Sequence, residues 1–261
     1  MEVMKHYKAK FDFLKKIIPK DNPVVVEIGA HYGEDSLRFL ETFPQITLHC
    51  FEPDPRNIKV FKKYVNDERV ILHETALSNK NGTAEFYQSY QEHNKAPTPD
   101  KYDWIDSVTY DEEKLNNSGS SSLKKGYEFT LGETVTVTTQ TYLDWADQNS
   151  VDAVDFVWMD VQGAEKDVLD GMGDAIRNIQ LFWMEYGETS YEDAMTREET
   201  IAYMSARGFA AVEKVSSQAA AGDLLFLRKE NREEFLYEKS YSTTSLISYV
   251  QLPRFTRRGH A

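Results

Sequence analysis

Apolar residues recur at two different periods along the chain, and these periods predict where its helices and strands lie. Near the N-terminus the spacing is three and four residues, at Met4, Tyr7, Phe11, Leu14 and Ile18. This spacing predicts an amphipathic helix, which ends at Pro19 because proline cannot continue the helical hydrogen bonds. The short apolar run over residues 24–28 instead predicts a buried strand.

Strand-like and helix-like segments then alternate through the first third of the chain. Strands are expected over residues 46–51 and 70–73, and the helices between the strands run through residues 37–43 and 58–65. Asp54 suits the N-cap of the second of these helices, and Pro55 suits its first position. This alternation predicts a parallel sheet with helices on both faces.

The middle of the chain departs from this alternation. Asn81-Gly82 is a strong turn signal and predicts a hairpin between Ala76-Leu77 and residues 84–87. Residues 89–133 are polar and rich in turn-forming residues, which predicts an insertion over the edge of the sheet. A strand over 134–139 and a helix over 140–149 lead back to the main pattern.

The α/β pattern resumes in the second half. We expect a strand over 156–159, a helix through 164–172, a strand over 181–184, a helix over 198–207 and a final strand pair over 209–212 and 224–227. The whole pattern predicts an N-terminal helix within residues 1–22 and one α/β domain over 23–229 that contains the insertion 89–133. Residues 230–261 form an aromatic, Ser-rich and finally basic tail.

Composition narrows the classes of function. The formal net charge of −13 argues against a nucleic-acid binder, because phosphate binding needs clustered Lys and Arg. The single cysteine, Cys50, excludes an internal disulfide and a cysteine zinc cluster. No apolar stretch approaches the roughly 20 residues of a membrane span, and residues 1–10 lack the apolar run of a secretory signal. We expect a cytoplasmic protein with a small-molecule or carbohydrate partner.

Notable residues follow several of the predicted strands. Ligands of an open parallel sheet bind beyond the carboxyl ends of its strands. Glu27 and the Gly29–Gly33 turn end the first strand, Glu52 ends the second, and Asp160 ends a later one. Glycines at the turn let the backbone approach a ligand closely. Glu52, 19 residues after Gly33, is placed to accept hydrogen bonds from ribose hydroxyls.

This layout suits either a dinucleotide or S-adenosylmethionine. A dinucleotide fingerprint needs glycines that admit a pyrophosphate to the helix N-terminus. Here the Glu27 carboxylate precedes Gly29 by two residues and would face a pyrophosphate poorly. It would face the ammonium of S-adenosylmethionine well, directly or through water. The residues therefore favour S-adenosylmethionine.

The motifs, taken together, resemble those of the FkbM family of methyltransferases. The resemblance rests on Glu27-Ile28-Gly29-Ala30-His31-Tyr32-Gly33, Phe51-Glu52-Pro53, Ala76-Leu77-Ser78 before Asn81-Gly82, Ser121-Ser122-Leu123 and Asp160-Val161-Gln162-Gly163-Ala164-Glu165. It covers roughly residues 24–229, and the order and spacing of several motifs make it far more specific than one glycine motif. The sequence departs from the family at Gln162, where an acidic residue is frequent, and at His31, where many members have a small polar residue.

The resemblance implies a Rossmann-like class I fold of seven strands, mostly parallel, with the last strand antiparallel. It also implies S-adenosylmethionine as methyl donor and O-methylation of sugars, glycans or polyketide-type metabolites. The predicted cofactor-binding residues are Glu27, Gly29, Ala30, Gly33, Glu52, Pro53, Ala76, Leu77, Ser121 and Asp160. Purely structural roles stay open for some of them: tight packing for the glycines, helix capping for Glu52, core packing for Ala76 and Leu77, and a flexible linker for the serines.

Three residues are candidates for catalysis. Asp160 ends a buried strand beside the predicted cofactor cleft, and Glu185 ends the next strand. His31 lies within the glycine motif, and a neutral imidazole can take a hydroxyl proton near neutrality. Asp160 and Glu185 are also hard oxygen ligands suited to Mg²⁺, but two carboxylates are a weak metal signal. A nicotinamide-dependent oxidoreductase and a non-catalytic cofactor-binding module remain as alternatives.

Overall fold

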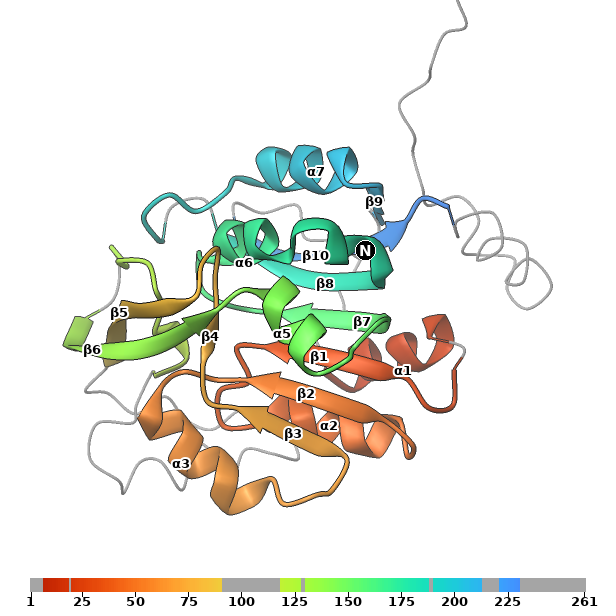
Figure 1. Cartoon of the computed structure of the whole chain (residues 1–261), viewed down its shortest axis with the longest axis horizontal. Helices are drawn as coiled ribbons and strands as arrows, with labels where there is room; N and C mark the ends of the chain where they lie inside the picture. The colour runs from red at the N-terminus through yellow and green to blue at the C-terminus, as the bar shows by residue number, and fades with distance from the viewer. Residues whose placement is uncertain are drawn as a thin grey trace, which may run out of the picture.

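Two sheets form the framework of this protein, which we describe from a computed structural model (Figure 1). The structure describes residues 7–18, 20–90, 118–127, 130–187, 190–212 and 221–230. The main sheet consists of β1 (Val24–Ile28), β2 (Thr47–Phe51), β3 (Val70–His73), β7 (Val154–Met159), β8 (Ile179–Gly187), β9 (Phe209–Ala211) and β10 (Ala221–Arg228). Its strand order is β3-β2-β1-β7-β8-β10-β9.

The central strands of the main sheet are parallel. β1 pairs with β2 and β7, and β7 pairs with β8, all in parallel, whereas β10 runs antiparallel to both β8 and β9. The predicted seven-stranded, mostly parallel sheet with a reversed final strand is therefore confirmed. The strand order reverses at β1, between β2 and β7, which is where ligands bind in such sheets.

Helices cover both faces of the sheet, and each face has its own core (Figure 1). One face packs against α1 (Tyr7–Ile17), α2 (Glu34–Thr42) and α3 (Pro55–Tyr64); the other packs against α5 (Tyr142–Gln148), α6 (Glu165–Met172) and α7 (Arg197–Ala206). Short 3-10 turns lie at Ser118–Ser120 and Gly173–Asn178. Because both faces are covered, β1 needs apolar residues on both sides, which explains its Val-Val-Val run.

The start of α3 follows the local sequence. Asp54 is its N-cap, and the Asp54 carboxylate accepts a hydrogen bond from the backbone N–H of Arg56 at 2.9 Å. Pro55 occupies the first helical turn, where its missing N–H costs nothing. Both predictions are confirmed, and the cap fixes where the chain turns after Glu52.

The smaller sheet contains β4 (Ala76–Leu77), β5 (Gly82–Tyr90) and β6 (Thr130–Gln140), in the order β4-β6-β5. The predicted hairpin between Ala76-Leu77 and residues 84–87 is wrong, because β6 lies between these segments. The Asn81 side chain accepts from the Thr141 N–H and donates to the Asp144 carboxylate. The turn residues are therefore tied to the start of α5, and β5 pairs with β6 instead.

β5 and β6 extend into both ends of the segment predicted as an insertion. Tyr90 and Thr130 are still partners across the two strands. Residues 91–117, most of the predicted insertion, lie outside the described residues, as does the tail beyond Glu230. The described part that returns, residues 118–127, lies against the carboxyl ends of the main sheet through the contacts given below.

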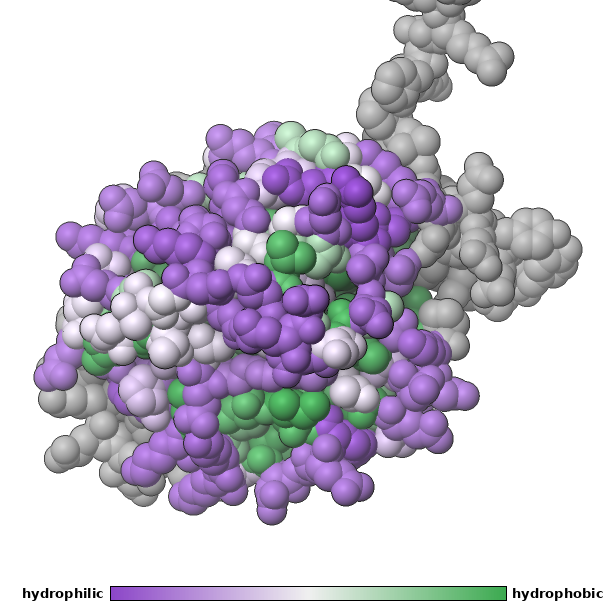
Figure 2. Space-filling model, viewed as in Figure 1, coloured by the Kyte–Doolittle hydropathy of each residue, from purple (hydrophilic) through white to green (hydrophobic). Residues whose placement is uncertain are grey.

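Hydrophilic residues cover most of the molecular face in Figure 2, with hydrophobic residues grouped over β2 and β3. Ile71 of β3 and Leu143 of α5 are large hydrophobic residues exposed at 41% and 44%. Among the described residues, no helix is both long enough and apolar enough to cross a bilayer.

Candidate cofactor pocket and active site

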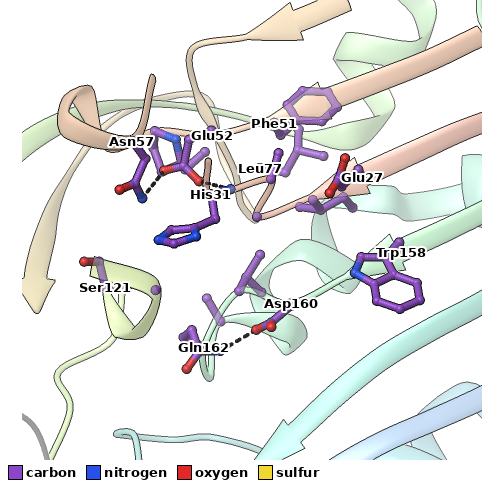
Figure 3. Close-up of a pocket in the computed structure, with 18 of the residues that line it drawn as sticks. Glu27, His31, Phe51, Glu52, Asn57, Leu77, Ser121, Trp158, Asp160 and Gln162 are labelled. Atoms are coloured by element: carbon purple, nitrogen blue, oxygen red, sulfur yellow. Dashed lines mark hydrogen bonds between the residues drawn. The ribbon is translucent and has the colours of Figure 1, made fainter. Parts of the chain in front are cut away.

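A cavity of about 260 Å³ opens at the carboxyl ends of β1, β2 and β7 (Figure 3). Of the predicted cofactor-binding residues, nine line it: Glu27, Gly29, Ala30, Glu52, Pro53, Ala76, Leu77, Ser121 and Asp160. His31 and Gln162 also line it. Two of the predicted site residues, Gly33 and Glu185, do not line the cavity.

Gly29 holds the ends of three strands together. Its φ is +89°, and a Cβ at this position would lie 1.8 Å from the Asp160 carbonyl oxygen. The backbone N–H groups of Gly29 and Ala30 both donate to the Phe51 carbonyl at 3.0 Å. A side chain at position 29 is therefore excluded, because it would collide with the backbone at the end of β7.

Gly33 has a different reason to be glycine. It is the N-cap of α2 with φ +90°, and a Cβ there would lie 2.3 Å from Val65 Cγ2. The constraint is thus close packing of α2 against the end of α3, which is the structural role that the sequence left open for the glycines.

Glu52 is buried at the end of β2 and organises the turn that follows (Figure 3). One carboxylate oxygen accepts from the Asp54 N–H at 2.8 Å and from Asn57 Nδ2 at 3.2 Å; the other accepts from the His31 N–H at 2.8 Å. A carboxylate has about four acceptor positions, so about one remains. Burial raises the pKa of Glu52 to about 7 despite these hydrogen bonds.

Asn57 has a side-chain oxygen that accepts no hydrogen bond from the described residues. Its Nδ2 donates to Glu52, but its buried Oδ1 has no hydrogen-bond partner among the described residues. Buried carbonyl oxygens are normally satisfied, so Asn57 Oδ1 is an unusual unpaired acceptor beside the cavity. Glu52, with about one acceptor position left, is the polar group of this pair that faces the cavity through its carboxylate.

Glu27 lies deeper, at 1% exposure. Its carboxylate accepts from the Ser36 hydroxyl at 2.5 Å and from the Cys50 thiol at 3.3 Å. Burial is the main cause that raises the pKa of Glu27 well above its usual value, followed by the charge of Asp35. A cationic ligand at this wall would favour the ionised form and oppose that shift.

His31 is held by partners on both ring nitrogens. Its φ is +50°, a conformation in which Asn, Asp and His are over-represented. Nδ1 lies 2.8 Å from Glu34 Oε1, and Nε2 lies 2.9 Å from Ser118 Oγ. The His31 interactions lower the pKa of Glu34, although burial of that carboxyl acts in the opposite direction. The imidazole thus connects the glycine turn to Ser118, and its role as a catalytic base stays a prediction.

Residues 118–122, here called the serine segment, lie across one side of the cavity (Figure 3). Ser118 Oγ contacts the Tyr32 hydroxyl at 2.6 Å in addition to His31. Ser121 Oγ accepts from Arg56 Nη2 at 3.1 Å. The Ser122 hydroxyl donates to the Val161 carbonyl at 3.2 Å. The segment is therefore fastened to the glycine turn, to α3 and to the turn after β7.

Asp160 and Glu185 form a pair of carboxyl groups that contact each other and share one donor, the Gln162 amide. Gln162 Nε2 donates to Asp160 Oδ1 at 2.5 Å and to Glu185 Oε2 at 2.8 Å. Burial and the Asp160 charge raise the pKa of Glu185 to about 10, and burial also raises the pKa of Asp160. Near neutrality Glu185 is therefore protonated. Glu185 reaches the cavity only through Asp160 and Gln162.

Several lining residues were missed by sequence reasoning: Glu34, Asp35, Arg38, Asn57, Phe86, Ser118 and Trp158. Asp35 and Arg38 form an ion pair at 2.8 Å, one turn into α2. Asp35 and Arg38 could have been predicted as lining residues because they follow the glycine motif within the first turns of α2. Asn57 could have been predicted in the same way, because it lies in the first turn after Glu52. Ser118 carried no local signal, because its partners lie 86 and 87 residues away.

Among the described residues, no group of three or more His, Cys, Asp or Glu side chains is arranged to hold a metal ion.

The strand order, the reversed β10 and a cavity with an acidic residue at the end of β2 define a Rossmann-like methyltransferase. The chain belongs to the FkbM family: residues 27–211 match the methyltransferase FkbM domain. The resemblance stated from the motifs is confirmed, and neither the oxidoreductase nor the non-catalytic alternative receives support.

The chain is similar to several proteins at low sequence identity. The chain is 29% identical over 174 residues to the 2-O-methyltransferase NoeI of Sinorhizobium fredii (strain NBRC 101917 / NGR234), and the alignment spans 66% of each chain. Methyltransferase FkbM from Methylobacillus flagellatus KT is 13% identical at a TM-score of 0.46, covering 79% of this chain and 44% of that one. The N-terminal domain of EvdMO1, solved in the presence of SAH and D-fucose, is 10% identical at a TM-score of 0.45, covering 86% and 83%.

Proposed function

We propose that this protein transfers a methyl group from S-adenosylmethionine to a hydroxyl oxygen of a sugar, glycan or small metabolite. The observation that carries the cofactor assignment is the Glu52 carboxylate, which lines the cavity at the end of β2 and keeps about one acceptor position. A carboxylate at this position suits the hydroxyls of a ribose. The distant relative NoeI is named as a 2-O-methyltransferase, which supports an oxygen acceptor.

The other walls of the cavity fit the remaining parts of S-adenosylmethionine. Leu77, Phe86 and Leu123 supply apolar surface for the adenine ring. Arg38 offers a guanidinium for the carboxylate, and Glu27 offers an acidic group for the ammonium. Acidic residues outnumber basic ones in the wall, which suits a ligand with a sulfonium and an ammonium.

S-adenosylmethionine, when bound, supplies an electrophilic methyl group: the oxygen–methyl bond forms as the methyl–sulfur bond breaks. The protein's task is to align the acceptor oxygen and to receive its proton. We assign the second role to Asp160, which lies at the carboxyl end of β7 in the cavity wall and forms a pair with Glu185. Asp160 and Glu185 are thus the proposed catalytic residues.

The direct test is calorimetric titration with S-adenosylmethionine, S-adenosylhomocysteine and NAD, followed by a methyl-transfer assay over neutral sugars, glycans and phenolic alcohols. We expect binding of the first two ligands only, and transfer to one class of hydroxyl. Binding of NAD, or binding of S-adenosylmethionine without transfer to any acceptor, would contradict the proposal.

Replacing Glu52 by Ala should weaken S-adenosylmethionine binding. A hydrogen bond to a charged group contributes about 1.5–3 kcal/mol, so the dissociation constant should rise about ten- to a hundredfold. Titration calorimetry on folded protein measures this change. Glu85→Ala, at an exposed position of β5, is the matched control and should bind as wild type does. An unchanged dissociation constant in Glu52→Ala would remove Glu52 from the ribose site.

Cofactor binding should also depend on pH through Glu52. Its pKa of about 7 means that the carboxyl group becomes protonated as the pH falls below neutrality, and only the ionised form accepts from a hydroxyl without itself donating. The ionised fraction is about tenfold smaller at pH 6 than at pH 8, so affinity should fall about tenfold. Asp35 and Glu165 titrate in the same range, and Glu52→Gln separates their effect. A slope that persists unchanged in Glu52→Gln would assign it to another group.

A further inference from the structure

The turn that follows β7 places an amide at the centre of the carboxyl pair. The two N–H bonds of Gln162 are directed at two different carboxyl groups, 2.5 Å from Asp160 Oδ1 and 2.8 Å from Glu185 Oε2. Carboxylate oxygens that face one shared atom can also be bridged by a divalent cation, which prefers oxygen ligands. Here the shared atom is a nitrogen of the protein itself.

We propose that Gln162 is a positioning residue that takes the place of a divalent cation between Asp160 and Glu185, so that this carboxyl pair receives the acceptor's proton without a metal. The inference rests on the proposed function, since it concerns the same reaction. In that reaction the hydroxyl proton moves to the ionised carboxylate of the pair while the other carboxyl remains protonated.

Tyr191 determines which way the Gln162 amide points. Its hydroxyl donates to Gln162 Oε1 at 2.6 Å and lies 3.1 Å from the Ser120 carbonyl. With the amide oxygen held by this donor, the nitrogen faces the carboxyl groups. The reverse orientation would bring the amide oxygen to within hydrogen-bond distance of the Asp160 carboxylate with no proton between them, which is repulsive. Tyr191 also connects the amide to the serine segment.

The backbone turn at residues 162 and 163 brings the Gln162 side chain back toward Asp160. Gln162 has φ +54° and Gly163 has φ +91°. A non-glycine residue in the left-handed region costs about 1–2 kcal/mol and is found where the surrounding structure requires it. A Cβ at Gly163 would lie 2.4 Å from the Cβ of Tyr191, so the turn and Tyr191 are packed against each other. The strained turn, the tyrosine and the amide form one unit.

A neutral donor suits proton transfer better than a cation does. A divalent ion would stabilise both carboxylates and lower their affinity for protons. Gln162 adds no charge, so burial keeps the proton affinity of both carboxyl groups high, and the Asp160 charge raises that of Glu185 further. The other charged groups that act on Asp160 or Glu185 are Glu165, Asp223 and His31, and Asp223 is paired with Lys10 at 2.6 Å.

The test converts the amide into a third carboxylate. In Gln162→Glu the three acidic side chains should form a cation site, so the folded variant should bind Mn²⁺, whereas the wild type and the surface control Gln148→Glu should not. Calorimetry or the electron paramagnetic resonance of Mn²⁺ measures this without an acceptor. It therefore gives a result even if the proposed methyl transfer is wrong.

Turnover completes the test. Wild-type activity should be unchanged within about twofold by EDTA or added Mg²⁺, and Gln162→Glu should lose about tenfold or more in EDTA. A folded Gln162→Glu that binds no Mn²⁺ would overturn the proposal, as would a wild type that EDTA inactivates and Mg²⁺ restores. Tyr191→Phe keeps the ring packed on Gly163 and removes only the hydroxyl, so its turnover should fall about tenfold with little change in S-adenosylmethionine affinity. Wild-type turnover in Tyr191→Phe would exclude its positioning role.

Discussion

Asp160→Asn should bind S-adenosylmethionine within about tenfold of wild type and methylate its acceptor at least about a hundredfold more slowly, as on loss of an acid–base group. Asn keeps the size of Asp and can still contact Gln162, so the cavity wall should be preserved. What it removes is the negative charge of the pair with Glu185, and with that charge the group that receives the hydroxyl proton. Calorimetry and a methyl-transfer assay on the same preparation separate the two effects.

Asp152→Asn is the matched control for this substitution. Asp152 is exposed just before β7, at the opposite end of the strand from Asp160. It should leave both affinity and turnover unchanged. Near-normal turnover in Asp160→Asn would exclude Asp160 as the proton acceptor and direct attention to His31, whose imidazole contacts Ser118 in the same cavity.

Gly29→Ala should be among the most damaging single substitutions outside the core. The new Cβ would overlap the Asp160 carbonyl oxygen at 1.8 Å, and a backbone atom in the sheet cannot move aside as a flexible side chain can. The φ of +89° adds a conformational cost of about 1 kcal/mol. We expect a loss of about 3 kcal/mol or more in the free energy of unfolding, measured by urea denaturation, together with loss of cofactor binding.

Gly82→Ala isolates the conformational part of that cost. Gly82 also has a positive φ, +137°, but a Cβ there would meet nothing within 4 Å. It should lose only about 1 kcal/mol and bind the cofactor normally. If the two variants were equally stable, the contact between the ends of β1 and β7 would not be the reason for glycine at position 29.

The sequence was sufficient to predict those features of the fold and site that depend on residues close together in the chain. Apolar runs identified the buried strands because both faces of the sheet are covered, and Asp54-Pro55 identified the start of α3 because a cap acts within one helical turn. Glu52 was identified by its distance from the glycine turn. Each of these features depends on residues that are close together in the chain.

Features that depend on residues far apart in the chain could not be predicted from local sequence patterns. The turn at Asn81-Gly82 contacts the start of α5 instead of closing a hairpin. Its Asn81 side chain is hydrogen-bonded to Thr141 and Asp144, which lie 60 and 63 residues away. Gly33 was assigned to the ligand, whereas its neighbour is Val65. The link from Gln162 to Glu185 depends on the parallel pairing of β7 with β8, which no single motif encodes.

The pairing of Tyr90 with Thr130 has a consequence for how such a protein can diversify. Tyr90 is held by β6, and Ser118 is held by Tyr32 and His31, so the length of the chain between Tyr90 and Ser118 can change while the cofactor pocket is left as it is. Closing a loop twice as long costs only about 0.6 kcal/mol more. Insertions, deletions and exchanges of this segment should therefore cost little stability. We expect related genes to have acquired new acceptors mainly here, with the strands and the Glu52 turn inherited unchanged.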